Sequence, residues 1–364
     1  MRSSRLRDIA LLLLAGFAGA TWAHTPGQNN AITDVPGISV GHYTGSDAGT
    51  TVVLAGGPSG EGVPSGMVSR GGSPGTRDTD VLNPVNRNEW VNAFVLSGGS
   101  LHGIAAAAGV MRCLEARGVG VAVAGGVVPI VPTAVSSDRA TCGGPPSTRP
   151  DLTAGLQACV AASSGAVEQG NVGAGTGAVS GGVKGGIGTA SVVLPNGIIV
   201  GAIVSVNSEG APYDDGGDLY AASVELGHEF RTLTRAGGFR WRVPQSLPGG
   251  PLRSGTNAVV ATNVQLTKAQ ATQVAQMADD GVARAVKPAH TAGDGDTLFV
   301  VGTARVAMST LGAESEVVTQ IGTAAANAVS RAIVHALLSA DSTSCRKSYC
   351  DTFPSACRNR RHWQ

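Results

Sequence analysis

The chain has 364 residues, a formal net charge of +1 and only 14% charged residues. This balance excludes the basic surface expected of a nucleic-acid-binding protein or of a protein held at an anionic membrane, and it favours a small or neutral substrate. The 53 glycines, with 42% hydrophobic but only 4% aromatic residues, indicate closely layered sheets and helices, because small residues let backbones approach one another.

The first residues have the pattern of an export signal. Three arginines within the first seven residues precede an apolar run over 9–20, and Thr21-Trp22-Ala23 follows it. The run falls short of the ~20 apolar residues that span a bilayer, so cleavage after Ala23 is favoured over a permanent anchor. We therefore expect 1–23 to be a signal peptide and the mature protein to be periplasmic or secreted. No membrane attachment is expected afterwards, because Gly, Pro or charged residues interrupt every later apolar run.

The first half of the mature chain is predicted to combine strands with two helices. Apolar and β-branched runs with glycine or proline punctuation predict strands, apolar residues at helical spacing predict helices, and a stretch rich in Pro, Gly and Ser predicts an exposed loop. The predicted strands cover 31–43, 51–54, 93–100 and 119–131, the helices 101–117 and 152–163, and the loop 136–149.

The second half begins with a strong hairpin signal. Asn196-Gly197 separates apolar runs over 192–194 and 198–204, and Asn-Gly is a preferred two-residue hairpin turn. A polar connector over 209–254 follows, and a connector of this length is usually a functional loop or a linker that is cut. Hairpins mixed with helices favour a layered α+β sandwich, in a single domain, over a doubly wound sheet. The domain is predicted to cover 24–340, with later strands over 258–262 and 297–303 and later helices over 267–286 and 314–338.

The six cysteines divide into a group in the body of the chain and a group near its end. The spacing of Cys345, Cys350 and Cys357 matches no common zinc pattern, and no histidine completes one. Disulfides or free thiols are therefore the better interpretation, and no metal is expected. The basic, aperiodic tail over 341–364 is predicted to be poorly ordered.

Common nucleotide-binding and catalytic motifs do not fit the sequence. The glycine-dense stretch over 170–178 lacks the third glycine of a dinucleotide-binding loop, and no His-Glu-x-x-His occurs. Ser97-Gly98-Gly99-Ser100 follows a predicted strand but lacks the spacing of a nucleophile elbow. A nucleotide-binding protein therefore ranks last among the functions considered, and no cofactor is expected.

Four small polar residues remain at the ends of predicted strands: Asn207, Thr256, Asp294 and Asp296. A threonine hydroxyl is a poor nucleophile at neutral pH, and one solution uses the α-amine of the same residue as base after the preceding peptide bond has been cut. Such a site needs a hydroxyl residue at the start of a strand, a long loop before it, and amides or carboxylates that orient the amine and hold an oxyanion. Gly255-Thr256, after the polar connector and before a strand, fits this pattern.

Seven short blocks lie along the chain between about Ile32 and Leu338. They are DVPGISVGHY (34–43), VLSGGS (95–100), VPIVP (128–132), GNVGAGTGA (170–178), KGGIGTAS (184–191), VATN (260–263) and DGDT (294–297). In their order they resemble the signature blocks of the DmpA-like aminopeptidases, the P1 family of L-aminopeptidases and D-esterases, whose relatives include β-peptidyl aminopeptidases and nylon-oligomer hydrolases. Together the blocks are far more specific than any one alone.

The resemblance implies a four-layer αββα sandwich like that of N-terminal-nucleophile hydrolases, and a precursor that cuts itself near 255/256. It implies release of N-terminal residues from small peptides, amides or esters, without a metal or cofactor, by a homo-oligomer that is commonly a tetramer. By position, Asn207 matches the family asparagine of the oxyanion site. Asp294 and Asp296 match the pair near the amine of the nucleophile, which here is Thr256.

Two functions remain open at the nucleophile. Many family members carry paired hydroxyl residues before Val-Val-Ala-Thr, whereas this chain has Gly255-Thr256-Asn257-Ala258 there. A shift of one residue turns a strand side chain to the opposite face. The first alternative is an active hydrolase that cuts itself before Thr256. The second is an uncut, catalytically impaired relative that binds peptides or is inactive.

Each residue also has a structural interpretation. Thr256 and Asp294-Gly295-Asp296 fit ordinary turns, and Asn207 fits a strand cap. Lys184 is predicted to be a solvated turn residue, and no role is assigned to it.

Overall fold

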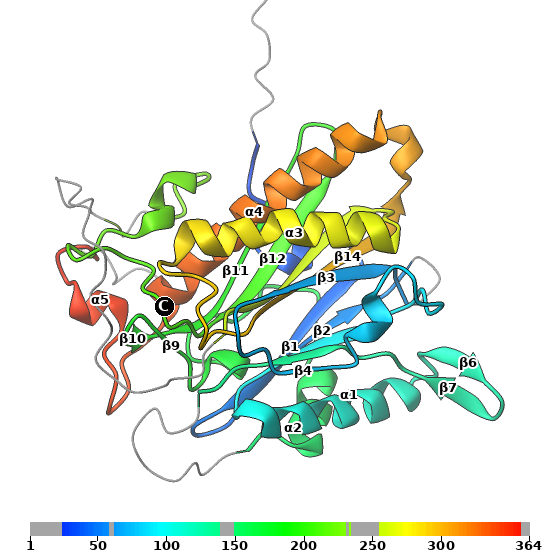
Figure 1. Cartoon of the computed structure of the whole chain (residues 1–364), viewed down its shortest axis with the longest axis horizontal. Helices are drawn as coiled ribbons and strands as arrows, with labels where there is room; N and C mark the ends of the chain where they lie inside the picture. Colours follow the sequence, from blue (N-terminus) through cyan, green and yellow to red (C-terminus); the bar gives the residue numbers. More distant parts are fainter. Residues whose placement is uncertain (1–23, 58–61, 139–148, 231–232, 234–254, 358–364) are drawn as a thin grey trace, which may run out of the picture.

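The protein folds into four layers, with two facing β-sheets inside, a pair of long helices on one outer side and a pair of shorter helices on the other (Figure 1). This is the expected αββα sandwich. The computed structural model describes residues 24–57, 62–138, 149–230, 233 and 255–357. The predicted signal peptide over 1–23 lies outside the described residues, as does most of the second half of the polar connector.

The first sheet carries the strands that end at the candidate site. Its order is β11-β12-β13-β14-β3, with β13 and β14 parallel and the other neighbours antiparallel. The predicted hairpin is confirmed, because β11 and β12 pair around Gly197, whose φ of +82° suits a residue without a side chain. The strands are β3 (Ser65–Arg70), β11 (Gly186–Val193), β12 (Ile199–Val206), β13 (Asn257–Val264) and β14 (Asp296–Val306).

The second sheet has the order β1-β2-β5-β8-β4, and two small hairpins lie beside the sandwich. The predicted single strand over 119–131 is wrong: the chain reverses at Gly125 and Gly126, whose φ angles are +91° and +158°, and forms the hairpin β6-β7. The strands are β1 (Ile38–Thr44), β2 (Gly49–Ala55), β4 (Thr76–Arg77), β5 (Ala93–Ser97), β6 (Val121–Val123), β7 (Gly126–Val128), β8 (Thr133–Val135), β9 (Val179–Ser180) and β10 (Val183–Lys184).

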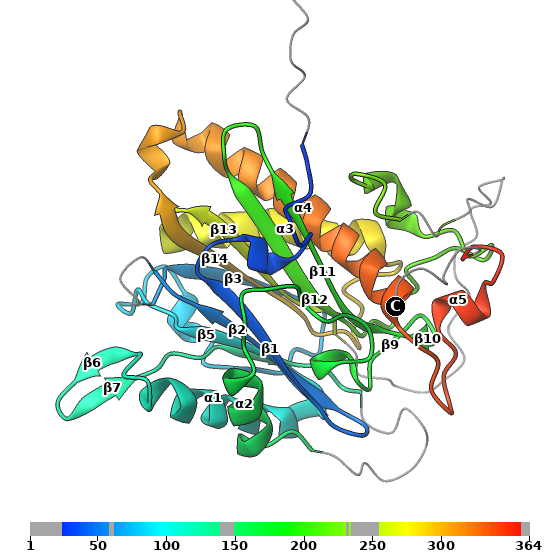
Figure 2. The ribbon, with the colours of Figure 1, turned by 180° about the vertical axis from the view of Figure 1, so that it is seen from behind.

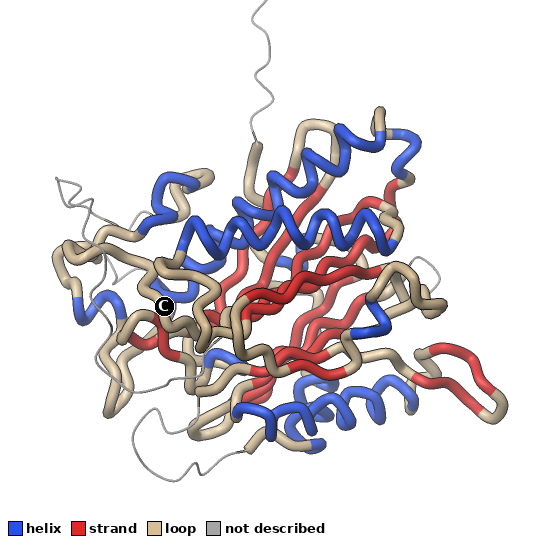
Figure 3. The backbone as a smooth tube through the Cα atoms, in the orientation of Figure 1, coloured by secondary structure: helices blue, strands red, loops and turns tan. Residues whose placement is uncertain are grey.

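Helices cover the outer face of each sheet, as the views from both sides and the colouring by secondary structure show (Figures 2 and 3). In the capping box at the start of α3, the Thr267 hydroxyl accepts from the Gln270 nitrogen and the Gln270 side chain accepts from the Thr267 nitrogen. The α-helices are α1 (Ala106–Glu115), α2 (Leu152–Val160), α3 (Lys268–Ala285), α4 (Glu314–Ser339) and α5 (Tyr349–Thr352). The 3-10 helices are η1 (Ile32–Asp34), η2 (Asp80–Leu82), η3 (Ser100–Ala105), η4 (Gly173–Gly175), η5 (Tyr220–Val224) and η6 (Met308–Thr310).

Three hydrophobic clusters fill the spaces between the layers. Successive residues of β13 alternate between two of them: Val259 faces the second sheet, whereas Val260 faces α3 and α4. Phe94 and Phe299 meet between the sheets, with ring centroids 5.1 Å apart. The alternation determines which face of β13 each side chain occupies. It thereby determines the register of β13 in the sheet and the position of Thr256 at the start of this strand.

Glycine permits the close approach that the composition predicts. A Cβ at Gly188 of β11 would lie 1.9 Å from the Ala332 carbonyl of α4, and one at Gly281 of α3 would lie 2.3 Å from the Ala326 carbonyl. Such distances leave no room for any side chain, so these glycines let α4 lie directly on the sheet and on α3.

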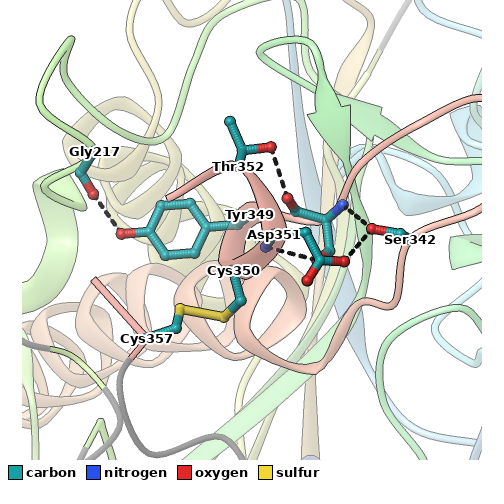
Figure 4. Close-up of a disulfide and its surroundings, with 8 residues drawn as sticks. Gly217, Ser342, Tyr349, Cys350, Asp351, Thr352 and Cys357 are labelled. Carbon is teal, nitrogen blue, oxygen red and sulfur yellow. Dashed lines mark hydrogen bonds between the residues drawn. A yellow bond between two sulfur atoms is a disulfide. The ribbon is translucent and has the colours of Figure 1, made fainter. Parts of the chain in front are cut away.

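The structure differs from the prediction of a poorly ordered tail over 341–364. Residues 341–357 are described, and they pack against the sandwich through α5 (Figure 4). Tyr349 is fully buried and donates a hydrogen bond to the Gly217 carbonyl, and a disulfide joins Cys350 to Cys357. An aromatic anchor and a covalent link thus hold a segment without hydrophobic periodicity. Residues 358–364 lie outside the described residues.

The helix α4 is long and apolar enough to cross a membrane, judged by length and composition alone. No later segment was expected to attach to a membrane, and by length and composition α4 is an exception to that expectation. However, 78% of its most apolar window is buried inside the protein. Such burial is typical of a core helix, here one that packs on β11, β12 and α3.

Candidate active site

Three of the four predicted site residues meet at one edge of the first sheet. Asn207 follows β12, Thr256 precedes β13 and Asp296 opens β14. Because β13 pairs with β12 on one side and with β14 on the other, these three strand ends lie side by side.

Thr256 is fully buried and is held through its backbone. Its nitrogen donates a hydrogen bond to Asp296 Oδ1 at 2.6 Å, and the nitrogen of Gly255 donates to the Asn207 carbonyl at 2.6 Å. The Thr256 hydroxyl oxygen has no hydrogen-bond partner among the described residues. Leaving a buried hydroxyl unpaired costs about 1–3 kcal/mol, so such groups often have a chemical role.

Asn207, whose carbonyl accepts from the Gly255 nitrogen, also carries a buried side-chain donor. Its Oδ1 accepts from the Val179 nitrogen at 2.9 Å, which fixes the orientation of the amide. Its Nδ2 is buried and has no acceptor within the described part of the chain. Asn207 therefore has an amide group available for an oxygen atom that enters the site.

A line of charged and polar groups extends from Asp296 away from Thr256. Asp296 Oδ2 lies 2.7 Å from His290 Nδ1, His290 Nε2 lies 3.3 Å from Asp279 Oδ2, and Arg70 Nε lies 3.5 Å from that same Asp279 oxygen. The hydrogen bond with Asp296 raises the pKa of His290, although partial burial opposes it. Burial raises the pKa of Asp279 to about 6, against the effect of nearby His290. The imidazole holds one oxygen of Asp296 and leaves the other facing the Thr256 nitrogen.

Asp294 holds the surrounding loops together. Its Oδ1 accepts from the Glu209 nitrogen at 3.1 Å, and its Oδ2 accepts from the Thr291 hydroxyl at 3.1 Å. It is 1% exposed. Asp294 thereby joins the start of the connector, at Glu209, to the loop between α3 and β14 that carries His290.

Lys184 is not the solvated turn residue that was predicted. It is 1% exposed, and its Nζ donates to the carbonyls of Gly175 and Gly185 at 2.7 and 2.8 Å. Burial lowers the pKa of Lys184 to about 7 and raises the pKa of Asp138 to about 7, while their mutual attraction opposes both shifts. The prediction failed because folding brings the Gly175 carbonyl, nine residues away, to the ammonium group beside the carbonyl of the adjacent Gly185.

Ser136 contacts the peptide group that precedes Thr256. Its hydroxyl donates to the Gly255 carbonyl at 3.1 Å and accepts from Asn257 Nδ2 at 3.0 Å. Ser136 is 1% exposed, so the prediction of an exposed loop over 136–149 is wrong at its start. Residues 139–148 of that loop lie outside the described residues.

Sequence reasoning missed His290 and Ser136. His290 lies six residues before Asp296 in a loop without a recognisable motif, and Ser136 begins a stretch whose composition indicates solvent exposure. One signal was available: Ser136 directly follows the apolar strand over 133–135, so its position at a strand end resembles that of Asn207.

The arrangement suits hydrolysis of an acyl bond. It combines an unpartnered hydroxyl, a nitrogen on the same residue held by a carboxylate, and an amide donor for a developing oxyanion. In the described part of the chain, no group of three His, Cys, Asp or Glu side chains is placed to hold a metal ion.

Comparison with known proteins identifies the family. A model of peptidase family S58 matches residues 30–350. An uncharacterized aminopeptidase of Mycobacterium leprae is 41% identical over 362 aligned residues, which cover 90% of this chain and 95% of that protein.

Solved structures show the same fold. A Burkholderia sp. β-aminopeptidase superposes with a TM-score of 0.66 at 24% identity, over 94% of this chain and 97% of that chain. The L-aminopeptidase D-Ala-esterase/amidase of Ochrobactrum anthropi, whose structure is described as a variant of the Ntn hydrolase fold, superposes with a TM-score of 0.61 at 21% identity, over 91% and 96% of the two chains. Family model, relative and fold agree with the resemblance found in the sequence blocks. The chain therefore belongs to peptidase family S58, the DmpA-like hydrolases of the aminopeptidase type.

Proposed function

We propose that the protein is a self-processing aminopeptidase in which Thr256 acts as an N-terminal nucleophile after cleavage of the Gly255–Thr256 bond. One observation carries the proposal: the Thr256 hydroxyl has no partner among the described residues, while its nitrogen lies 2.6 Å from Asp296 Oδ1. Cleavage turns that nitrogen into an α-amine beside a carboxylate that orients it.

Self-cleavage proceeds within the folded precursor. Thr256 Oγ attacks the Gly255 carbonyl carbon, and its proton passes to the leaving nitrogen as the C–N bond breaks. The products are an ester between Gly255 and Thr256 Oγ and a free α-amine. Water then hydrolyses the ester, which releases the Gly255 carboxylate and restores the hydroxyl.

Substrate hydrolysis uses the same groups. The α-amine takes the proton from Thr256 Oγ as the oxygen attacks the substrate carbonyl, and it returns that proton to the leaving amine or alcohol. The unpartnered Asn207 Nδ2 is the donor available for the oxyanion on the substrate. Water then hydrolyses the acyl-enzyme.

The proposed substrates are small peptides, amides or esters with a free N-terminal residue. The names of the two similar structures include a β-aminopeptidase and an aminopeptidase that is also a D-Ala-esterase and amidase. A panel of L-, D- and β-aminoacyl p-nitroanilides therefore tests the acyl preference. The arginine-rich start and apolar run support export to the periplasm or medium, and the family resemblance supports a homo-oligomer, a tetramer.

The test compares the wild type with Thr256→Ala and Thr256→Ser. On a reducing denaturing gel the mature wild type should give fragments of roughly 24 and 11 kDa out of a full chain of 36.3 kDa. Thr256→Ala should remain one band and lose more than about 10³-fold of p-nitroanilide hydrolysis, whereas Thr256→Ser, which keeps a hydroxyl, should still be cut. Thr319→Ala, at an exposed threonine of α4, is the matched control and should behave as the wild type.

Two results would contradict the proposal. Cleavage of Thr256→Ala would place the nucleophile on another residue. A wild type that stays intact and hydrolyses no member of the panel would be the uncut relative instead.

A further inference from the structure

We infer that Ser136 is a catalytic residue of self-cleavage, whose hydroxyl stabilises the oxyanion that forms on the Gly255 carbonyl oxygen. The inference rests on the proposed function, because it requires the Gly255–Thr256 bond to be the bond that is cut. It assigns to Ser136 a part in processing that is separate from the part of Asn207 in substrate hydrolysis.

The backbone around Ser136 fixes the position of its side chain. Ser136 follows β8, its nitrogen donates to the Ser97 carbonyl at 2.8 Å, and its carbonyl accepts from the Ser100 nitrogen at 3.0 Å. The residue is 1% exposed, and its Oγ lies 3.1 Å from the Gly255 oxygen. Donors of oxyanion sites lie about 2.7–3.1 Å from the position that the oxyanion will occupy, and here the oxyanion develops from this same carbonyl oxygen.

The direction of this hydrogen bond follows from the atoms that take part. A carbonyl oxygen only accepts, so the Ser136 proton lies between Ser136 Oγ and the Gly255 oxygen. The lone pairs of Ser136 Oγ then accept from Asn257 Nδ2 at 3.0 Å. The hydrogen bonds therefore run in one direction, from the Asn257 amide to Ser136 and from Ser136 to the Gly255 oxygen. A hydroxyl that accepts a hydrogen bond donates a stronger one, so Asn257 strengthens the hydrogen bond from Ser136 to Gly255.

Negative charge develops where Ser136 donates. When Thr256 Oγ bonds to the Gly255 carbonyl carbon, the π electrons of the carbonyl move onto its oxygen. They return as the C–N bond breaks and the nitrogen takes the proton of Thr256 Oγ. Ser136 keeps its own proton throughout, so it stabilises the intermediate without being consumed. A buried donor is effective there because little water screens the charge.

The two reactions at Thr256 present different oxygens to the site. In the precursor, the Asn207 carbonyl holds the Gly255 nitrogen at 2.6 Å, while the Gly255 oxygen is held by Ser136. After cleavage Gly255 leaves as a carboxylate, and Ser136 loses its partner. Asn207 Nδ2, buried and without an acceptor in the described structure, is then the donor proposed for the carbonyl oxygen of an incoming substrate.

The experiment measures processing and turnover separately. Precursors of wild type, Ser136→Ala, Ser136→Thr and Thr256→Ala are purified promptly, and their conversion into two fragments is followed over time on reducing denaturing gels. Ser137→Ala is the matched control: this neighbouring serine is bonded to the Ser100 hydroxyl at 3.1 Å. Turnover of a p-nitroanilide is then expressed per cut chain.

Ser136→Ala should slow processing by about 10²-fold or more, as removal of one oxyanion donor does elsewhere. Its turnover per cut chain should fall by a much smaller factor, whereas a general packing defect would lower both alike. Ser136→Thr, which keeps the hydroxyl, should process faster than Ser136→Ala, and Ser137→Ala should process as the wild type does.

Processing of Ser136→Ala at the wild-type rate would overturn the inference and leave the proposed function intact, provided that Thr256→Ala stays uncut. Cleavage of Thr256→Ala would instead overturn the proposed function. Folding is checked by comparing the thermal unfolding of the Ser136→Ala and Thr256→Ala precursors. Should Ser136→Ala fail to unfold cooperatively, Ser136→Cys replaces it, because a thiol has nearly the same shape but is a weak donor. A wild-type processing rate in Ser136→Cys would then overturn the inference.

Discussion

His290 lies between two carboxylates, and each of its ring nitrogens faces a different one. Asp296 approaches from β14 and Asp279 from α3, while Arg70 of β3 lies beyond Asp279. The hydrogen bond with Asp296 raises the pKa of His290, so the charged imidazole persists to a higher pH than in an ordinary histidine. Its contribution to stability is complete below the unfolded pKa, about 6.5, and is lost as the pH rises through the higher folded value.

We predict that His290→Asn changes the pH dependence of turnover. We expect the wild-type kcat to fall on the alkaline side as His290 loses its proton and its hold on Asp296 weakens. His290→Asn keeps a side-chain donor but cannot titrate, so its kcat profile should lack this alkaline limb. We expect its best kcat to be lower by about 10- to 100-fold, because small misplacements of reacting groups are costly, with little change in KM.

His102→Asn, at an exposed histidine, is the control for this measurement. The pH dependence of kcat, measured on fully cut protein, checks the prediction. An alkaline limb that is identical in wild type and His290→Asn would show that the charge of His290 does not hold Asp296 in its catalytic position.

Asn207, Thr256 and Asp296 were chosen from the sequence because each lies at the end of a strand with a clear apolar pattern and because the family resemblance points to the same positions. Their meeting depends on strand order, which periodicity does not encode. Ser136 was missed because its partner Gly255 lies 119 residues away, a separation at which a loop without periodicity gives no sign of contact. His290 was missed although Asp296 is only six residues away, because its loop carries no recognisable motif.

At the scale of elements, α4 is tied to the connector by a buried ion pair. Arg331, in the middle of α4, donates to both carboxylate oxygens of Glu229, at 2.5 and 2.7 Å, and His335 Nε2 lies 3.2 Å from the same carboxylate. Burial alone would raise the pKa of Glu229, but the hydrogen bonds from Arg331 and His335 lower it to about 2. The connector is thereby attached to the helix layer at Glu229, near the end of its described residues.

We predict that Glu229→Gln destabilises the protein by about 3–5 kcal/mol, because it leaves the buried Arg331 charge without its counter-ion. Asp280→Asn is the matched control, since Asp280 pairs with Arg284 at 3.8 Å on the exposed surface of α3, where such pairs contribute about 0–1 kcal/mol. Denaturant unfolding of the uncut Thr256→Ala background compares the two. Equal effects of both substitutions would contradict the prediction.

The same pair predicts a pH dependence. The folded pKa of Glu229 is lowered, so its contribution is complete above the unfolded value of about 4.3 and is lost as the pH falls toward 2. The difference in melting temperature between the uncut Thr256→Ala protein with and without Glu229→Gln should therefore be constant near neutral pH and shrink below about pH 4. A difference that persists unchanged at pH 2 would exclude the charge as its cause.

Elements with strong local signals were predicted well, and those defined by their neighbours were not. The hairpin around Asn196-Gly197 and the helices α3 and α4 follow from turn chemistry and periodicity. β3 was missed because Ser65-Gly66-Met67-Val68-Ser69-Arg70 has no apolar run, and it is a strand because β14 offers it an edge. The sequence around β3 gives no sign of this pairing, because β14 lies far away in the chain.

At the scale of the whole molecule, the proposed cut would divide one sheet between two chains. β13 and β14 would belong to the small chain, and they lie between β12 and β3 of the large chain. Both sides of the small chain's strand pair are thus hydrogen-bonded to the large chain, and α4 packs on β11 and β12.

We therefore predict that processed protein elutes in size-exclusion chromatography at the same volume as uncut Thr256→Ala, although it gives two bands on a reducing denaturing gel. Separation of the fragments under native conditions would contradict this interleaving. The uncut variant serves as the size standard, so any oligomerisation affects both samples alike.

Because the strands of the two chains are interleaved, processed protein and precursor should differ in their ability to refold. An intact chain brings β12 and β13 together through a tether, whereas severed halves depend on a bimolecular encounter and lack that effective concentration. Each half alone would expose a long unpaired strand edge, and such edges invite aggregation. Unfolded processed protein should thus refold far less readily than unfolded precursor. The lifetime of the processed protein would then depend on its unfolding rate and not on its equilibrium stability.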